Sequence, residues 1–397
     1  MILNLSRTLF GLGICMAGLA ASPNAVDHPS VREIVIFDGE AGWEHEGVLY
    51  RLACGASVRE APNGDLLCWW LSGGDSEPST DNNVLMARST DRGKTWSEPE
   101  IFIAAGEMAG ACTAIWPTSD GRLIAFAAQW PAEKEYTQWF YTRRVSTDNG
   151  HTWGPPEPFV VHDTHAAVGG PIQLANGEYV FAGSFFDQRE TPLTGSVWDL
   201  LNAKTEAEAL AVPPANGDPG MPSKFLRFLH GTSVYITPNE DGTGLTEYGR
   251  IANRPLGLLE PTCVQLKDGR IVMLMRAENA GYLWRAESSD NGRTWTEAWE
   301  TDIPNPTSSI QLLRLDDSRI ALLHNACGER GKMIPRDPLS LWVSDDDLAT
   351  WSLKADLLHS GWLAYPNGIV LDGTLVFVYD RNRRQVRFVE VEIPEGR

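Results

Sequence analysis

The most constraining feature of this chain is a short segment that recurs six times: an Asn or Asp, then a Gly, then a run of apolar residues. The six segments begin at Asn63, Asp120, Asn176, Asp268, Asp317 and Asp372. Ser318 replaces the glycine in the fifth. Asn-Gly and Asp-Gly supply the positive φ angles of a tight hairpin, and the apolar run is typical of a strand. Successive segments lie 49 to 57 residues apart, with one interval of 92. Such a repeat indicates propeller blades, and six units predict six blades.

A second repeat lies in register with the first. Three segments share the formula Ser-x-Asp-x-Gly-x-Thr-Trp and a fourth has lost its glycine; they cover residues 89–96, 146–153, 288–295 and 344–351. The Asp side chain can cap backbone N–H groups, the Gly can adopt a left-handed conformation, and the Trp can pack between sheets. We interpret these segments as structural turns. Their Asp residues are expected at the periphery of the face opposite any catalytic site.

The formula is the Asp-box of the sialidase (neuraminidase) superfamily, which the chain resembles from about Val48 to Val391. The resemblance implies an all-β fold, a six-bladed β-propeller of the sialidase type. The function it implies is that of a secreted exo-glycoside hydrolase. Such an enzyme removes a terminal acidic sugar, sialic acid or a similar one, from glycans by a retaining mechanism.

The continuous repeat predicts one closed propeller over residues 31–395 rather than two domains. Residues 31–51 are expected to supply the strand that closes the ring with the C-terminal blade. The 92-residue interval carries an irregular insertion around residues 188–257, in which residues 205–210 are a candidate short helix. An insertion of this kind either shapes the substrate mouth or is decoration, and the sequence leaves both interpretations open.

The N-terminus resembles a secretory signal, predicted over residues 1–22. Arg7 precedes an apolar run from Leu9 to Ala20, and small residues follow it. The run is too short to span a bilayer, and no later segment is predicted to do so. We therefore expect a secreted or periplasmic protein.

Charge and cysteine content exclude several classes of partner. The formal net charge of −19 argues against nucleic acid or a membrane surface as partner. The partner that the resemblance implies is a glycan. Five cysteines follow the predicted signal, and none shows Cys-x-x-Cys spacing. An odd number without that spacing indicates neither a disulfide framework nor a zinc site, so no metal or cofactor is predicted. The oligomeric state stays open.

The densest candidate for chemistry is the hairpin around Asp268 and Gly269. Glu260 and Arg276 lie at the outer ends of two strands of nearly equal length, so both return to the same face of the propeller. A carboxylate and a guanidinium that meet there are costly to desolvate unless they are used or paired. The resemblance implies that Glu260 polarises a catalytic tyrosine and that Arg276 binds the substrate carboxylate. A purely structural ion pair is the alternative.

Tyr365, just before the last hairpin, resembles the family's nucleophilic tyrosine. A neutral phenol, with a free pKa of about 10, attacks an anomeric centre poorly, so an adjacent Glu260 carboxylate would take its proton. Sialidases are an exception to the paired-carboxylate rule of glycosidases. The alternative is a rim tyrosine that only packs.

The resemblance implies two further site residues. Arg336 resembles another carboxylate-binding arginine, with Arg330 as the rival assignment. Asp81, in the loop before the first Asp-box, resembles the acid/base, with Asp75 as its rival. The alternatives are a surface arginine and a solvated loop aspartate. The residues predicted to converge on one face around the axis are Glu260, Arg276, Arg336, Tyr365 and Asp81.

One position departs from the family pattern. Cys54 falls nearest the place of the family's first substrate-binding arginine, and Arg51, three residues away, would point to the opposite face of a regular strand. A site with two arginines is therefore expected. Other functions stay open: a propeller acting on uronate-containing polysaccharide as a lyase or another glycosidase, or a non-catalytic carbohydrate-binding propeller. His165 and Tyr365 are the lyase candidates, whereas His45 and His324 are expected to be structural or on the surface.

Overall fold

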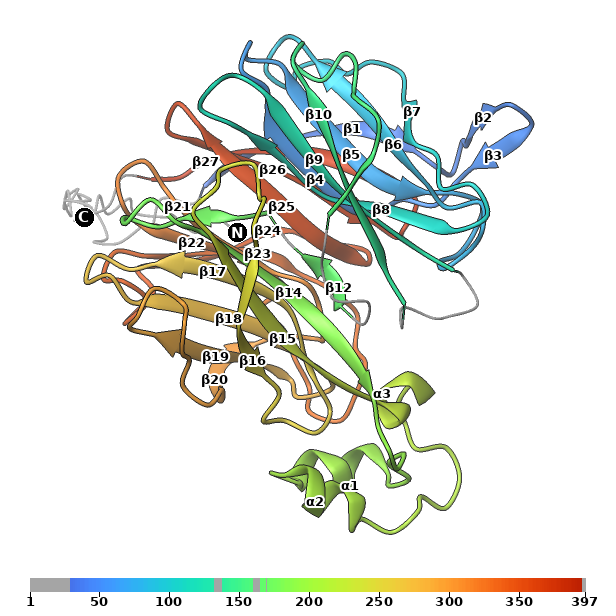
Figure 1. Ribbon diagram of the computed structural model, residues 1–397, viewed down its shortest axis with the longest axis vertical. Helices are drawn as coiled ribbons and strands as arrows, with labels where there is room; N and C mark the ends of the chain where they lie inside the picture. Colours follow the sequence, from blue (N-terminus) through green and yellow to red (C-terminus); the bar gives the residue numbers. More distant parts are fainter. Residues whose placement is uncertain (1–28, 132–137, 160–164, 169, 395–397) are drawn as a thin grey trace, which may run out of the picture.

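The structure, a computed structural model, describes residues 29–131, 138–159, 165–168 and 170–394, with the backbone alone at 165–168. The predicted signal segment, residues 1–22, lies outside this part of the chain. Within the described residues the strands form six antiparallel sheets of four or five strands and one two-stranded hairpin (Figure 1). This is a six-bladed β-propeller, and it confirms the fold expected from the repeats.

Blades 1 to 3 follow one another along the chain. Blade 1 contains β4 (Cys54–Glu60), β5 (Leu66–Ser72), β6 (Asn83–Ser89) and β7 (Glu100–Ile103). Blade 2 contains β8 (Ala109–Pro117), β9 (Leu123–Trp130), β10 (Phe140–Ser146) and β11 (Glu157–Pro158). Blade 3 contains β12 (His165–Val168), β13 (Ile172–Gln173), β14 (Tyr179–Gln188), β15 (Phe228–Thr237) and β16 (Thr246–Ile251).

Blades 4 to 6 complete the ring. Blade 4 contains β17 (Leu258–Gln265), β18 (Ile271–Ala277), β19 (Tyr282–Ser288) and β20 (Trp299–Pro304). Blade 5 contains β21 (Gln311–Arg314), β22 (Ile320–His324), β23 (Leu339–Ser344) and β24 (Leu353–Leu358). Blade 6 contains β25 (Leu363–Leu371), β26 (Thr374–Arg381), β27 (Gln385–Glu392) and β1 (Ser30–Asp38). The separate hairpin is formed by β2 (Trp43–His45) and β3 (Val48–Tyr50).

The N-terminal strand closes the ring. β1 pairs antiparallel with β27, from Ser30 opposite Glu392 to Asp38 opposite Gln385. Phe37 in β1 is buried and packs 5.3 Å, centroid to centroid, from Trp70 of blade 1. The last blade is thus completed by the start of the chain, as predicted, and the ring has no open edge at the joint.

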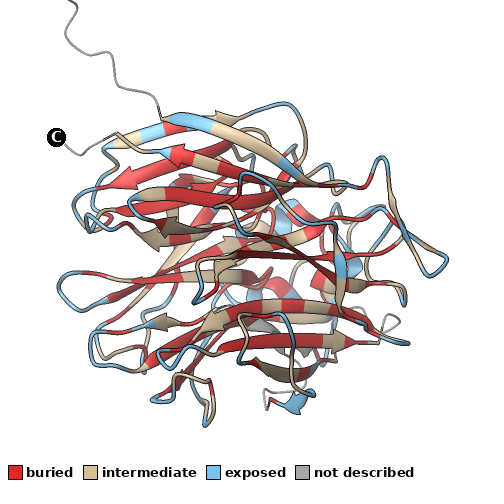
Figure 2. Cartoon of the chain, turned by 90° about the horizontal axis from the view of Figure 1, so that it is seen from above, coloured by how far each residue is buried: buried red, intermediate tan, exposed pale blue. Residues whose placement is uncertain are grey.

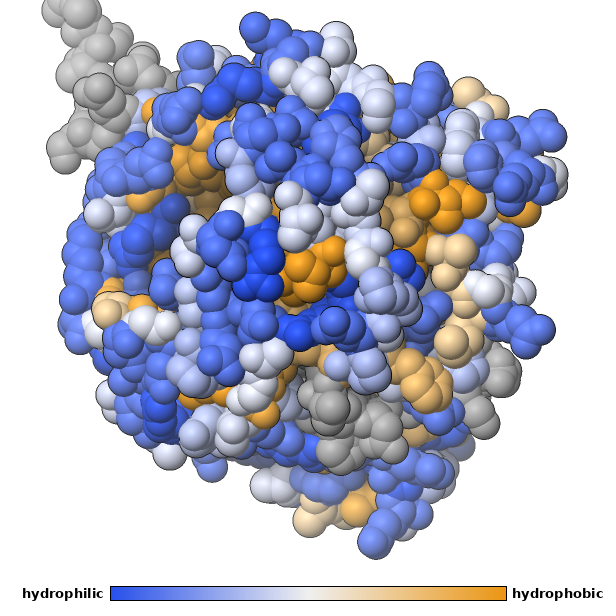
Figure 3. All heavy atoms as spheres, turned by 45° about the horizontal axis from the view of Figure 1, so that its top comes forward, coloured by the Kyte–Doolittle hydropathy of each residue, from blue (hydrophilic) through white to orange (hydrophobic). Residues whose placement is uncertain are grey.

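The core lies within and between the blades. Every residue of β5 is buried, because the second strand of a blade is covered on both faces by neighbouring blades. Figure 2 shows buried residues along the strands and exposed residues concentrated in the connecting loops. The space-filling view in Figure 3 shows hydrophilic residues over most of one face, with hydrophobic residues in patches between them.

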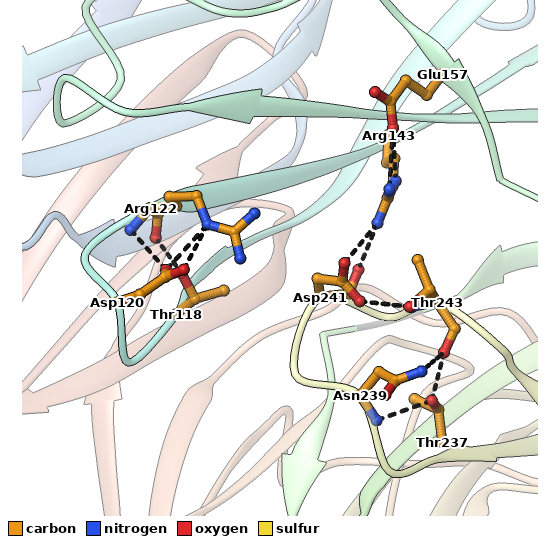
Figure 4. A network of polar contacts seen from close by, with 9 residues as sticks. All are labelled: Thr118, Asp120, Arg122, Arg143, Glu157, Thr237, Asn239, Asp241 and Thr243. Atoms are coloured by element: carbon orange, nitrogen blue, oxygen red, sulfur yellow. Dashed lines mark hydrogen bonds and ion pairs between the residues drawn. The ribbon is translucent and has the colours of Figure 1, made fainter.

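An arginine of blade 2 links it to blade 3. Arg143 in β10 forms ion pairs with Glu157 in β11, at 2.9 Å, and with Asp241 in the β15–β16 turn of blade 3, at 3.0 Å. Figure 4 shows this arginine between the two carboxylates, and the neighbouring hairpin in which Arg122 pairs with Asp120. The contact joins the outer strands of blade 2 to the β15–β16 turn of blade 3.

The insertion is shorter than the sequence suggested. Its helices are α1 (Val197–Asn202), α2 (Glu206–Leu210) and α3 (Ser223–Arg227), which lie at one end of the molecule in Figure 1. Thr205 caps α2 by accepting the N–H of Glu208, so the expected short helix is present. The expectation that residues 188–257 are irregular is wrong for residues 228–237 and 246–251, which form β15 and β16. The Asp241-Gly242 turn between these strands is followed by polar residues, so the hairpin pattern missed it.

The four Ser-x-Asp segments form one kind of turn. In the first, Asp91 accepts the N–H and the hydroxyl of Thr95, at 2.8 and 2.6 Å, while Ser89 Oγ accepts the N–H of Gly93. The Thr95 hydroxyl is the main reason that the pKa of Asp91 falls to about 2. In the fourth copy Leu348 replaces the glycine, with a φ of 67° close to the 81° of Gly93. The turn conformation is therefore retained where the glycine is lost.

Candidate active site

A cavity of about 370 Å³ lies on the propeller axis, because all six blades contribute to its wall. One lining residue from each blade, in order, is Cys54, Cys112, Ser184, Glu260, Ile310 and Tyr365. A second cavity, of about 960 Å³, shares Glu260, Ser309, Ile310 and Asn367 with the first. Its wall also includes Lys267 and Asp316, at the other ends of these strands. The axis is therefore open along much of its length.

β-Bulges aim side chains into this cavity. The register of β17 shifts between Leu259 and Thr262, and that of β25 shifts between Ala364 and Asn367. Inside these shifts Glu260 and Tyr365 have positive φ angles of 44° and 53°. Such values are rare for residues other than glycine and tend to occur at functional sites. The same bulge in two different blades thus turns a carboxylate and a phenol toward the axis.

Glu260 is held by Arg276. Arg276 Nη1 donates to both carboxylate oxygens of Glu260 at 2.9 Å. Desolvation opposes ionisation of Glu260, but the charge of Arg276 and its hydrogen bonds outweigh it, so the pKa of Glu260 lies below its usual value. The same pairing raises the pKa of Arg276 although desolvation acts to lower it. Glu260 is an anion, and Arg276 a cation, at neutral pH.

Tyr365 lines the same cavity as Glu260. The Glu260 carboxylate is the largest influence on the phenol and, with desolvation, raises the pKa of Tyr365 well above 10. A negative charge disfavours a second one nearby. The resting site therefore combines a neutral phenol with an ionised carboxylate within electrostatic reach.

Arg336 lies beside these residues, whereas its rival Arg330 does not. The Arg336 guanidinium is 5.6 Å from the centroid of the Tyr365 ring and 4.9 Å from that of Trp362. It donates to the Thr307 carbonyl at 2.9 Å and is buried. Arg330 instead pairs with Glu300 at 2.5 Å. The geometry favours Arg336 as the second arginine of the site.

The structure does not bring Asp81 to the cavity wall. Asp81 Oδ2 accepts the Gly74 N–H at 3.0 Å within its own loop, and the rival Asp75 pairs with Arg384 at 2.8 Å. Neither lines the axial cavity, but Glu77 of the same loop does. The expectation that Asp81 converges with the other four is therefore not met in this conformation. Sequence reasoning missed Glu77, which lies between the two aspartates in the loop.

Blade 1 presents Cys54 in place of an arginine. The Cys54 thiol is 3.4 Å from Glu77 Oε1, and desolvation followed by the Glu77 charge raises the pKa of the thiol well above its usual value. Glu77 also pairs with Arg383 at 2.7 Å, which places a different arginine at this end of the site. Arg51 is exposed and does not line the cavity.

A buried carboxylate lies behind Cys54. Asp380 in β26 is fully buried; its Oδ2 accepts the Gly55 N–H at 3.3 Å, and its Oδ1 has no partner within the described chain. Burial raises the pKa of Asp380 to about 8, although Arg336 opposes the shift. No feature of the sequence pointed to this residue.

The insertion reaches the cavity. Lys224 and Phe225 of α3 line it together with Phe186 and Ser184 of β14. Burial lowers the pKa of Lys224, with a further contribution from the charge of Arg276. Of the two interpretations left open for the insertion, the structure supports the one in which it shapes the mouth of the site.

The remaining candidates lie elsewhere. The side chain of His165 is outside the described residues. His45 stacks on Trp43, and His324 is buried edge-on to Trp342. The Asp residues of the four repeated turns do not line the cavity.

Within the described residues, no His, Cys, Asp and Glu side chains cluster as metal ligands do, and no helix is long and apolar enough to cross a membrane.

Comparison with known proteins identifies the family. The BNR repeat-like domain matches residues 64–378, which is most of the chain. The chain belongs to the BNR repeat-like family. It is also 24% identical to a sialidase of Micromonospora viridifaciens over 360 residues, covering 80% of this chain and 48% of that protein. It therefore spans about half the length of this curated relative.

Solved structures share the fold. The Hadza microbial sialidase Hz136 superimposes with a TM-score of 0.66 at 15% identity, over 91% of this chain and 68% of that one. A mutant of Trypanosoma rangeli sialidase displaying trans-sialidase activity gives 0.65 at 16% identity, over 91% and 58%. A Dyadobacter fermentans protein of unknown function gives 0.64 at 17% identity, over 92% and 99%. The fold is that of a sialidase-like propeller.

Proposed function

We propose that this protein is a sialidase-type exo-glycoside hydrolase in which Tyr365 is the nucleophile. The observation that carries the proposal is the placement of Tyr365 and Glu260 in one axial cavity, each on a bulge with positive φ. Their charge states match the needs of the reaction, since a neutral phenol faces an ionised carboxylate that can accept its proton.

The reaction would proceed by two displacements. Tyr365 Oη attacks the anomeric carbon while its proton passes to Glu260. The bond from that carbon to the departing oxygen breaks, and an acid protonates the leaving group. Water then attacks the same carbon and gives a proton to the conjugate base of that acid, while the bond to Tyr365 breaks and Glu260 returns the proton to the phenolate. Two inversions give net retention of configuration.

The cations of the site support an acidic sugar as substrate. Arg276 and Arg336 carry fixed positive charge beside Glu260 and Tyr365, and a planar guanidinium suits a carboxylate. A neutral nucleophile also avoids repulsion with an anionic sugar. The predicted signal segment adds the proposal that the enzyme acts outside the cytoplasm.

The test compares the mature wild-type protein with Tyr365→Phe and Glu260→Gln. Each receives sialosides and uronate-capped oligosaccharides, while free sugar and the absorbance of unsaturated products are followed together. We expect release of free acidic sugar by the wild type and losses of about 100-fold or more in both variants. A fluorinated sialoside with a good leaving group should leave a sugar adduct on the peptide that contains Tyr365.

Two results would contradict the proposal. Unsaturated products that persist in Tyr365→Phe and disappear in His165→Ala would establish a lyase instead. Full activity of Tyr365→Phe on a sialoside would show that Tyr365 is not the nucleophile. Thermal unfolding of each variant controls for folding, since a single pocket hydroxyl contributes only about 1 kcal/mol to stability.

A further inference from the structure

A further concave site, apart from the two axial cavities, lies between blades 4 and 5, on their outer strands. It is a groove of about 460 Å³, and its wall includes Trp299 and Asp302 of β20, Trp351 of the fourth repeated turn, and Lys354 of β24. It shares no lining residue with the axial cavity. The groove is therefore separate from the proposed active site.

An exposed aromatic ring forms one wall of this groove. Trp299, the first residue of β20, is 42% exposed, and the Arg285 guanidinium is 6.0 Å from its ring centroid. Trp351, on the opposite wall, is partly exposed and packs edge-on against Trp342 at 5.4 Å. A flat indole left in contact with water offers a surface on which the C–H face of a sugar ring can stack.

The polar groups of the groove are available to a ligand. Asp302 and Lys354 are both exposed, yet they form no ion pair with each other. Within the described chain neither charged group has a hydrogen bond or an ion pair, and the Lys354 ammonium lies 3.8 Å from the centroid of the Trp342 ring. Among the groove's polar side chains, Asp302 thus offers an acceptor, and Lys354, above the Trp342 ring, offers a donor. A sugar hydroxyl can satisfy both, because it accepts and donates hydrogen bonds.

The charge of the groove favours an uncharged ligand. Glu287 pairs with Arg285 at 2.7 Å and also with Arg270, which in turn pairs with Asp268, so the charges of these four residues cancel. Asp302 and Lys354 are left with opposite charges that also cancel. The chain as a whole carries a formal charge of −19, which repels a polyanion at long range. A neutral sugar does not encounter that repulsion.

We propose that the groove between blades 4 and 5 binds a neutral polysaccharide, with a hexose or pentose ring stacked on Trp299 and hydroxyls bound by Asp302 and Lys354. The site would hold the protein on a glycan matrix away from the axial cavity. This inference does not rest on the proposed function, since it concerns different residues and a different ligand.

Native gel electrophoresis in the presence of soluble polysaccharide tests the proposal. The full-length mature protein is run in gels that contain xylan, mannan, galactan or mixed-linkage glucan, and in one that contains polygalacturonate. We expect at least one neutral polymer to retard the wild type, and Trp299→Ala to bind it about tenfold more weakly, the usual cost of losing one aromatic anchor. Trp299→Phe should retain most of the retardation, and Lys354→Met should lose part of it.

The matched control is Trp198→Ala, which removes a 53% exposed indole from α1, outside the groove. It should migrate as the wild type does in every gel. Trp299→Ala should also turn over a small synthetic sialoside at the wild-type rate, which separates this site from the axial cavity. Absence of retardation by every neutral polymer, retardation by polygalacturonate alone, or wild-type retardation of Trp299→Ala would each overturn the proposal.

Discussion

At the scale of single residues, the site is built from equivalent positions in different blades. The residue inside the first-strand bulge is Gly55 in blade 1, Glu260 in blade 4 and Tyr365 in blade 6, and all three have positive φ. Likewise Arg276 and Asp380 occupy the same register position on the second strands of blades 4 and 6. The same first-strand bulge therefore presents a carboxylate in blade 4 and a phenol in blade 6.

Asp380 should make stability depend on pH. Its folded pKa of about 8 lies above the ordinary 3.8, so the folded state binds the extra proton and stability falls as pH rises between these values. Asp380→Asn removes the ionisation and keeps an acceptor for the Gly55 N–H. We expect the variant to gain stability relative to the wild type between pH 5 and pH 8, measured by urea unfolding at both values. A constant difference would show that Asp380 does not titrate in this range.

The proton donor can be assigned by comparing Glu77→Gln with Asp81→Asn. Loss of the true acid slows substrates with poor leaving groups by about 100-fold and hardly affects activated aryl glycosides, which need no protonation. Because Glu77 lines the cavity in this conformation, we expect that signature in Glu77→Gln. If Asp81→Asn shows it instead, the loop that carries both residues must move when substrate binds.

At the scale of elements, the repeated turns are held by their own hydrogen bonds, and their Asp residues do not line the axial cavity. In the second turn Asp148 accepts the N–H and the hydroxyl of Thr152 at 2.9 and 2.6 Å. Asp148→Asn weakens both contacts and should lower Tm by roughly 1–3 °C in a domain of this size. Activity per folded molecule should be unchanged. A large loss of turnover at full folding would mean that the turn influences the site.

At the scale of the whole molecule, the joint between β1 and β27 makes the ring one cooperative unit. Phe37 packs across this joint against blade 1, so Phe37→Ala should cost about 3–5 kcal/mol of unfolding free energy. Val35→Ala on the same strand is the control, because Val35 is 43% exposed and should cost little. Denaturant curves followed by fluorescence and by circular dichroism should coincide for both. Separate transitions would show that the blades unfold independently.

The sequence by itself determined the architecture, because the features that define it are local. An Asn-Gly or Asp-Gly turn and the apolar run beside it specify a hairpin wherever they occur, and a regular spacing of such hairpins specifies a ring. The same reasoning placed Glu260 and Arg276 together, since strand lengths on either side of one turn decide which ends meet. The hairpin pattern did not predict β15 and β16, because the turn at Asp241-Gly242 is not followed by an apolar run.

Tertiary structure alone decided the rest of the site. Cys54 and Glu77 belong to blade 1 and Asp380 to blade 6, so closure of the ring brings Asp380 to the other two. No local sequence pattern predicts that Glu77 rather than Asp81 faces the cavity. Both residues belong to one loop, whose conformation depends on contacts with Cys54 and Arg383. Burial likewise gives Asp380 its raised pKa, and burial is a property of the assembled blades rather than of neighbouring residues in the sequence.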